Sequence, residues 1–124
     1  ENGNWSEQAL LSLADIYYLQ GKASRALGLY KRHIEKYKSS SEIEHSLFQI
    51  GRIYSRDLNA PRKAVPYYEK ILSNKGNDYF KHALHELHTY YKRRGLTYKA
   101  KELYDAYTDD LIPKKWSDLS SQYQ

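Results

Sequence analysis

Apolar residues recur along the chain with the spacing of one helix face, and the same arrangement appears three times. Leu10, Leu13 and Tyr17 are separated by three and four residues, which is the periodicity of an amphipathic α-helix. The set returns after 37 residues as Leu47, Ile50 and Tyr54, and after 37 more as Leu84, Leu87 and Tyr91. We therefore interpret the chain as three internal repeats.

A second helical series follows each first one, an alanine with a tyrosine four residues later. The pairs are Ala26/Tyr30, Ala64/Tyr68 and Ala100/Tyr104. A small alanine lets two helices approach closely, and the tyrosine fills the neighbouring groove. The pairs are spaced by 38 and 36 residues, so one residue is inserted in the middle repeat.

Signals for helix starts and ends agree with this pattern. Asn4-x-x-Glu7 and Ser41-x-x-Glu44 have the form of capping boxes, and Asp78 is a candidate cap for a third helix. Gly21 and Gly95 occupy the same repeat position, where a helix must end and turn back. Asp57-Leu58-Asn59 does this in the middle repeat, Pro61 suits a first helical turn, and Pro66 is expected to kink its helix.

These signals predict an all-α fold of six helices arranged as three hairpins in one domain, residues 1–124. The predicted helices are 5–20, 23–38, 42–57, 61–73, 78–94 and 97–110, in repeats of about 5–40, 41–77 and 78–110 with a tail at 111–124. Trp5 and Trp116 are expected to cover the two ends of the stack, since the ends of a solenoid need caps. The alternative for the tail is that Lys114-Lys115-Trp116 contacts a partner or a membrane surface.

The recurring residues resemble those of tetratricopeptide repeats, over about residues 5–110. The best-matching repeat is "LFQIGRIY" followed by "AVPYYEKIL". The period of 37 residues is longer than the usual period of about 34, His88 stands where a small residue is usual, and there is no closing proline. The resemblance implies an α-solenoid that acts in protein–protein interaction.

The longer period and "YKRHIEKYKSSSEIEHSLFQIGRIY" are similar to a narrower group, the bacterial cell-envelope repeat lipoproteins of the BamD and CpoB type. This implies a scaffold in an envelope complex such as outer-membrane β-barrel protein assembly, located in the periplasm and anchored to the outer membrane. The partner would be the barrel assembly protein or an extended substrate segment. Such lipoproteins carry an acylated N-terminal cysteine, and this chain has no cysteine and does not begin with Met, so a processed or truncated form is expected.

The resemblance also implies which residues face a partner, because the first helix of each repeat lines the concave surface. Mapped onto this sequence, the lining is Gln8, Leu11, Asp15, Tyr18, Leu19, His45, Phe48, Arg52, Ser55, Arg56, His82, His85, Thr89, Lys92 and Arg93. The predicted partner-binding groove within this set is Tyr18, His45, Phe48, Arg52, Arg56, His82, His85, Lys92 and Arg93. Its arginines would suit carboxylates on an extended or helical protein segment. The alternative is that these are ordinary solvated helix charges.

Three histidines in "HALHELHTYY" raise the question of a metal or catalytic site. The groove mapping places His82 and His85 on the lining and His88 at a helix-packing position, so they do not form one site. "HELH" is not the H-E-x-x-H pattern of zinc proteases, and a zinc site needs three or four ligands. We therefore predict no metal, no cofactor, no small-molecule substrate and no catalysis.

Two other functions are alternatives to an envelope scaffold. The net charge of +5 and the pI of 9.2 motivate a nucleic-acid-associated repeat protein, but 15 acidic residues are interspersed with 20 basic ones. A cytoplasmic tetratricopeptide adaptor is the other alternative. The carboxylate clamp of chaperone-binding members is absent. Its positions are occupied here by Leu11, Asp15, Gln49 and His82, with His85 and Glu86.

Overall fold

The computed structural model of the 124-residue chain describes residues 6–111, with side chains to residue 107. The elements in chain order are α1 (Glu7–Leu19), α2 (Ala23–Lys36), α3 (Ile43–Arg52), the π-helical turn η2 (Ile53–Asp57), α4 (Pro61–Ile71), α5 (Phe80–Arg93) and α6 (Thr97–Leu111). All six predicted helices are present within a few residues of their predicted bounds. The described part of the chain contains no strand, which confirms the all-α prediction.

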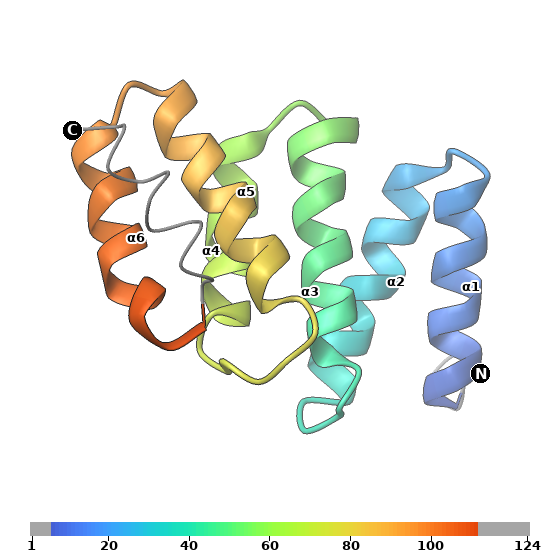
Figure 1. Cartoon of the computed structure of the whole chain (residues 1–124). Coiled ribbons are helices and arrows are strands. Elements are labelled where there is room, and N and C mark those ends of the chain that lie inside the picture. Colours follow the sequence, from blue (N-terminus) through green and yellow to red (C-terminus); the bar gives the residue numbers. More distant parts are fainter. Residues whose placement is uncertain (1–5, 112–124) are drawn as a thin grey trace.

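The helices form three antiparallel hairpins that stack side by side, α1 with α2, α3 with α4 and α5 with α6 (Figure 1). Each hairpin packs on the next through its second helix, since α2 contacts α3 and α4 contacts α5. This is the arrangement of a solenoid, in which every repeat contacts its neighbours along the stack. The predicted caps Trp5 and Trp116 lie outside the described residues.

The alanine–tyrosine pairs of the second helices lie in the core as predicted. Ala26 and Tyr30 are fully buried, and the other two pairs are at most 4% exposed. One apolar cluster joins α1, α2 and α3, and a second joins α3, α4 and α5. Ile34, Tyr54 and Tyr67 touch both clusters, so the core is continuous from the first hairpin to the third.

The turn between the two helices of each hairpin is closed by a backbone hydrogen bond to the carbonyl of an equivalent tyrosine. The amide of Lys22 donates to the carbonyl of Tyr17 over 2.9 Å, and the amide of Leu96 donates to that of Tyr91 over 2.8 Å. Gly21 and Gly95 take positive φ angles of 79° and 75° there, which glycine adopts without steric cost. The predicted helix ends at these glycines are confirmed.

The turn of the middle repeat is closed by the same kind of hydrogen bond but contains one more residue. The amide of Ala60 donates to the carbonyl of Tyr54 over 2.7 Å, which spans six residues instead of five. Asn59 takes the positive φ, 51°, one position later than the glycines of the other repeats. The extra residue is taken up in η2, where the amide of Leu58 bonds to the carbonyl of Ile53 over 2.9 Å, the wider spacing of a π-turn.

Both prolines of the middle repeat lie in α4. Pro61 is in the first turn, as predicted, where its missing amide hydrogen leaves no intrahelical bond unmade. The helix continues through Pro66 to Ile71.

The predicted helix caps were wrong, because neighbouring residues take those roles. The hydroxyl of Ser6 accepts from the amide of Ala9 at the start of α1, while Asn4 lies outside the described residues. Ser40, and not Ser41, accepts from the amide of Glu42 before α3. Ahead of α5, Tyr79 is the N-cap without a side-chain bond. The side chain of Asn77, and not Asp78, accepts from the amide of Tyr79.

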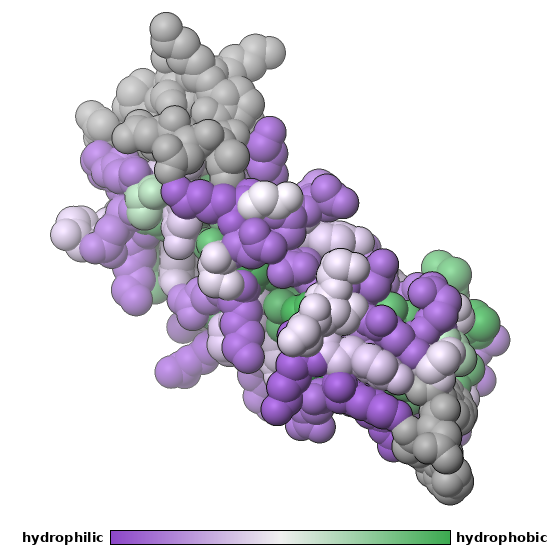
Figure 2. Space-filling model, turned by 90° about the horizontal axis from the view of Figure 1, so that it is seen from below, coloured by the Kyte–Doolittle hydropathy of each residue, from purple (hydrophilic) through white to green (hydrophobic). Residues whose placement is uncertain are grey.

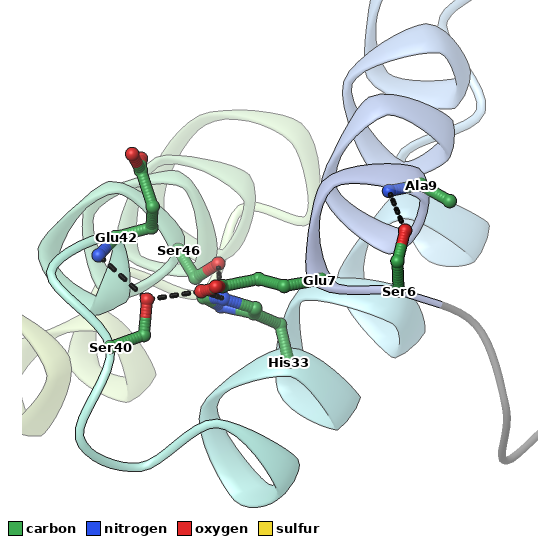
Figure 3. A network of polar contacts seen from close by, with 7 residues as sticks. All are labelled: Ser6, Glu7, Ala9, His33, Ser40, Glu42 and Ser46. Atoms are coloured by element: carbon green, nitrogen blue, oxygen red, sulfur yellow. Dashed lines mark hydrogen bonds and ion pairs between the residues drawn. The ribbon is translucent and has the colours of Figure 1, made fainter.

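Glu7 is unavailable for a capping box because its side chain crosses to the second helix (Figure 3). Its carboxylate lies 2.8 Å from Nε2 of His33 and also accepts from the hydroxyl of Ser40. The other imidazole nitrogen of His33 is 2.7 Å from the hydroxyl of Ser46 on α3. This polar network links the start of α1, the end of α2 and the start of α3.

Candidate functional site

The predicted groove face begins with a polar network around His45, on the first turn of α3. The imidazole of His45 lies 3.1 Å from the carboxylate of Asp15 on α1 and 2.9 Å from the hydroxyl of Tyr79, just before α5. Asp15 also accepts from the hydroxyl of Tyr30. Burial and this carboxylate raise the pKa of Tyr30 above its usual range, so Tyr30 is a neutral donor. One histidine of α3 thus contacts both α1 and the residue that precedes α5.

A row of stacked side chains continues along α3. The guanidinium of Arg52 lies over the rings of Tyr18 and Phe48, 5.7 and 5.8 Å from their centroids, a cation–π arrangement. The ring of Phe48 also packs on Tyr79 and meets His82 edge-on, with centroid distances of 5.3 and 5.9 Å. We name Tyr18, His45, Phe48, Arg52, Tyr79 and His82 the aromatic row.

A cavity of about 370 Å³ follows the aromatic row, between the second hairpin and α5. We name it the arginine cavity. Its lining is Ser55, Arg56, Asn59, Pro61, Val65, Tyr68, His85, Glu86, Thr89, Tyr90, Arg93 and Arg94. A shallower depression lined by Lys81 and His82 adjoins it through the shared residues His85 and Glu86.

The cavity exists because two large side chains are replaced by two small ones. Tyr18 and Arg52 fill the space between α1 and α3. Their equivalents 37 residues later are Ser55 and Thr89, which line the cavity from η2 and from α5. Since serine and threonine are much shorter than tyrosine and arginine, the same space is left open.

The wall of the arginine cavity carries more positive than negative charge. Arg56, Arg93 and Arg94 are exposed along it, and Glu86 is the single acidic residue of the lining. The carboxylate of Glu86 lies 3.2 Å from a guanidinium nitrogen of Arg56. One arginine is therefore paired in part, and the other two leave the wall net positive.

The hydroxyl of Tyr68 is an unusual group in this wall. Tyr68 is 3% exposed, and its buried hydroxyl makes no hydrogen bond. Burial raises the pKa of Tyr68, and the hydroxyl of Ser55, which lies nearby without the geometry of a hydrogen bond, lowers it by less, so the group remains a neutral donor. The Nε of Arg52 is also buried without a hydrogen-bond partner. A buried polar atom without a partner costs free energy, so both atoms call for an explanation.

The repeat pattern explains how Tyr68 lost its acceptor. Tyr30 is the equivalent residue of the first hairpin, and its hydroxyl donates to Asp15. The residue 37 positions after Asp15 is Arg52, which has no acceptor atom on its side chain. Tyr68 therefore keeps the position of Tyr30 without the carboxylate that would receive its proton.

The three histidines of "HALHELHTYY" do not converge. His82 and His85 are exposed, whereas His88 is 7% exposed and meets the ring of Tyr104 edge-on at 5.0 Å. Burial, with the nearby charges of Lys92 and His85, lowers the pKa of His88. Among the described side chains, those of residues 6–107, no three histidine, aspartate or glutamate side chains are placed to share a metal ion.

The predicted groove residues thus fall into two neighbouring groups. The aromatic row brings together Tyr18, His45, Phe48, Arg52 and His82. The arginine cavity is lined by the predicted residues Arg56, His85 and Arg93. Phe48 is buried in the core, so it supports the row rather than offering its own surface. Lys92 is exposed but lies outside the cavity lining.

Several residues of these groups were not predicted as site residues, among them Tyr68, Tyr79, Glu86 and Arg94. Tyr68 was assigned to packing alone, although its lost acceptor can be found by comparing Asp15 with Arg52. Tyr79 precedes α5 and Glu86 lies between the mapped lining positions of that helix, so the family mapping did not include them.

The outer face of α1 carries exposed apolar side chains. Ile16 and Leu19 are 48% and 84% exposed, and Figure 2 shows apolar surface gathered at the α1 end of an otherwise mostly hydrophilic face. Among the described residues, none of the helices has the length and apolar character needed to cross a membrane.

Comparison with known proteins gives one match. The family model described as Tetratricopeptide repeat matches residues 9–44, which are α1, α2 and the first residues of α3. No curated protein and no solved structure matches the chain. The matched hairpin and the two hairpins that follow it share the same repeat positions, core pairs and turn closures. Residues 9–44 are therefore similar to a tetratricopeptide repeat, and the described part of the chain is an all-helical stack of three tetratricopeptide-like hairpins.

Proposed function

We propose that this protein is a non-catalytic scaffold that binds an acidic, extended or helical segment of another protein along α1, α3 and α5. The observation that carries the proposal is the arginine cavity next to the aromatic row, on the face formed by the first helices. Tetratricopeptide repeats generally mediate protein–protein interaction. Arginine binds carboxylates through two parallel hydrogen bonds, and an apolar anchor beside charged contacts is typical of peptide recognition.

Nucleic-acid binding is the second candidate, favoured by the net charge of +5 and by aromatic rings beside arginines. Proteins that bind single strands offer open ring faces on which bases stack. In the aromatic row the rings pack on one another, and Phe48 is buried. The arrangement therefore favours a protein segment.

A displayed library of random peptides, selected against the full chain, tests the scaffold. We expect enrichment of sequences that combine acidic and apolar residues. Arg56→Glu with Arg93→Glu should abolish their binding, whereas Arg32→Glu with Arg62→Glu should retain it. Arg32 and Arg62 are equally exposed but lie on the second helices α2 and α4, so the control makes the same change in net charge.

Two results would contradict the proposal. One is a selection in which no peptide is enriched. The other is enrichment that survives the Arg56/Arg93 reversal, since the site would then lie elsewhere. Binding of a fluorescent single-stranded RNA whose affinity falls steeply with salt would favour the second candidate instead.

The cellular setting that we propose is the bacterial envelope, with the chain as an accessory subunit of outer-membrane β-barrel assembly. The proposal is motivated by the period of 37 residues and by the segment "YKRHIEKYKSSSEIEHSLFQIGRIY", which resembles repeat lipoproteins of the BamD and CpoB type. Cross-linking in the source cell, followed by capture of the full-length protein, tests this setting. Recovery of the barrel assembly protein, lost with Arg56→Glu/Arg93→Glu, is the expected result. Recovery of cytoplasmic proteins alone would favour the adaptor alternative.

A further inference from the structure

We propose that the arginine cavity is a subsite for one carboxylate side chain, an aspartate or glutamate of the bound segment, which accepts a hydrogen bond from the buried hydroxyl of Tyr68. This inference deepens the proposed function and rests on it. It differs from a general preference for acidic sequences because it assigns one acidic side chain to one cavity and names a donor among its lining residues.

The first argument is the missing acceptor. In the first hairpin the hydroxyl of Tyr30 donates to the carboxylate of Asp15. In the second hairpin Tyr68 takes the same place in the core, and the residue equivalent to Asp15 is Arg52. A carboxylate from outside the chain would restore the bond that Tyr30 makes within it, and would satisfy a donor that is now buried without a partner.

The second argument is the shape of the site. The space opened by Ser55 and Thr89 runs to Tyr68, since all three residues line one cavity of about 370 Å³. Val65, Pro61 and the ring of Tyr90 form its apolar wall, which suits the methylene groups of an acidic side chain. The hydroxyls of Ser55 and Thr89 lie on the same lining and are further donors.

The third argument is charge. Arg93 and Arg94 stand at the wall of the cavity and favour an anion over a neutral amide. Glu86 is in the same wall, paired at 3.2 Å with Arg56. The wall therefore favours an anion, and a carboxylate is the anionic group that a protein segment carries without modification.

The probe for this inference is glutamate blocked at both ends, as its N-acetyl amide, titrated into isotope-labelled full chain and followed by NMR. Blocked glutamine is the matched neutral probe and blocked phosphoserine the matched phosphate. We expect saturable shifts of the backbone amides of Ser55, Thr89 and Arg93 with glutamate and none with glutamine. Tyr68→Phe should weaken binding by about tenfold, since a hydrogen bond to a charged acceptor is lost.

A second variant fills the cavity without touching the arginines. Ser55→Tyr with Thr89→Arg reproduces the pair that closes the space between α1 and α3, so it should fold and lose glutamate binding. Tyr67→Phe is the control, because it removes a tyrosine hydroxyl from the same helix, away from the cavity lining. It should bind blocked glutamate like the wild type.

The outcomes separate this inference from the scaffold proposal. Equal binding of glutamate and glutamine, full binding by Tyr68→Phe, or tighter binding of phosphoserine would each overturn the carboxylate subsite. If library-selected peptides still bind Ser55→Tyr/Thr89→Arg normally, the scaffold stands and the subsite fails. If no peptide binds even the wild type, the scaffold itself fails.

Discussion

Nε2 of His33 lies 2.8 Å from the carboxylate of Glu7, so a fully buried imidazole on α2 meets an acidic residue in the first turn of α1. The other ring nitrogen of His33 bonds to Ser46 on α3. The two contacts hold the first hairpin together and attach it to the second. They also make the N-terminal part of the stack sensitive to acid.

Acid should weaken the protein through Glu7. Hydrogen bonds from Ser40 and then His33 lower the pKa of Glu7. Because the pKa is lower in the folded state, this stabilisation is complete above about pH 4.5, the value for an unperturbed glutamate, and is lost as the pH falls below it. Glu7→Gln should lower stability at pH 7 and flatten its fall between pH 5 and 3. Urea unfolding followed by circular dichroism measures both effects.

Glu35→Gln is the matched control, since Glu35 is an exposed glutamate on α2. Its stability should follow that of the wild type across the same pH range. An unchanged acid slope in Glu7→Gln would mean that other carboxylates carry the effect.

Removing the same hydroxyl should have different effects at Tyr30 and Tyr68. Tyr30→Phe removes the donor to Asp15 and should lower the free energy of unfolding by about 1–2 kcal/mol. Tyr68→Phe removes a buried hydroxyl that makes no hydrogen bond, so its effect should lie within about 0.5 kcal/mol or be stabilising. Denaturant unfolding of both variants gives the comparison. Equal losses would mean that the Tyr68 hydroxyl is already bonded in the free protein.

Two helical glycines should respond in opposite directions to alanine. A Cβ on Gly51 would lie 2.5 Å from the ring of the buried Tyr68, so Gly51→Ala should destabilise the protein by about 1–3 kcal/mol through overpacking. Gly28 lies inside α2, where an added Cβ would meet no atom within 4 Å. Gly28→Ala should therefore stabilise by about 0.5–1 kcal/mol through helix propensity. Melting temperatures that move in the same direction would contradict this packing.

Deleting one residue should be tolerated at η2 and not at the end of α1. Without Asp57, the π-turn can close as an ordinary α-turn, and the turn of the middle hairpin regains the length of the other two. Gln20 is the equivalent residue of the first repeat, where no spare residue exists and the bond from Lys22 to Tyr17 would be broken. We expect the Asp57 deletion to unfold cooperatively near the wild-type midpoint and the Gln20 deletion to lose several degrees. The reverse order would show that η2 is required for folding.

His88 should give the protein a second, milder pH dependence. Burial is the main cause of its lowered pKa, so the folded state disfavours the protonated ring. Its contribution to stability is complete above about pH 6.5, the unperturbed value, and declines as the pH falls below it. His88→Leu should flatten the stability profile between pH 7 and 5, while His82→Gln, at an exposed histidine of the same helix, should retain the wild-type slope. Thermal unfolding across this pH range tests the difference.

The helices and the core could be predicted from the sequence because three copies of one pattern reinforce each other. Alanine and tyrosine at Ala26/Tyr30 and at the equivalent pairs fix which face of each second helix is buried. Glycine at Gly21 and Gly95 marks the turns, since few other residues adopt a positive φ. A single copy of any of these signals would have been ambiguous.

The caps and the cavity depend on contacts between residues far apart in the sequence. Glu7 has the spacing of a capping box, but His33, 26 residues later, takes its carboxylate. The spacing of the alanine–tyrosine pairs showed that one residue is inserted. The spacing did not show that η2 accommodates this residue, because that depends on which hydrogen bonds form across the turn. The arginine cavity depends on a pairing of Ser55 with Thr89 that only stacking of the second and third hairpins creates.

The wide turn at η2 has a consequence for how such a stack accommodates turns of different length. One inserted residue would rotate the residues after it by about 100° if the helix continued regularly, which would change the face that α4 turns to the core. Because η2 absorbs the residue before the chain reverses at Asn59, α4 buries Ala64 and Tyr68 as α2 buries Ala26 and Tyr30. Leu84 follows Tyr68 by 16 residues where Leu47 follows Tyr30 by 17, so the first helices keep their spacing of 37 residues. Hairpins whose turns differ in length can therefore follow one another in this protein while their buried positions stay in line.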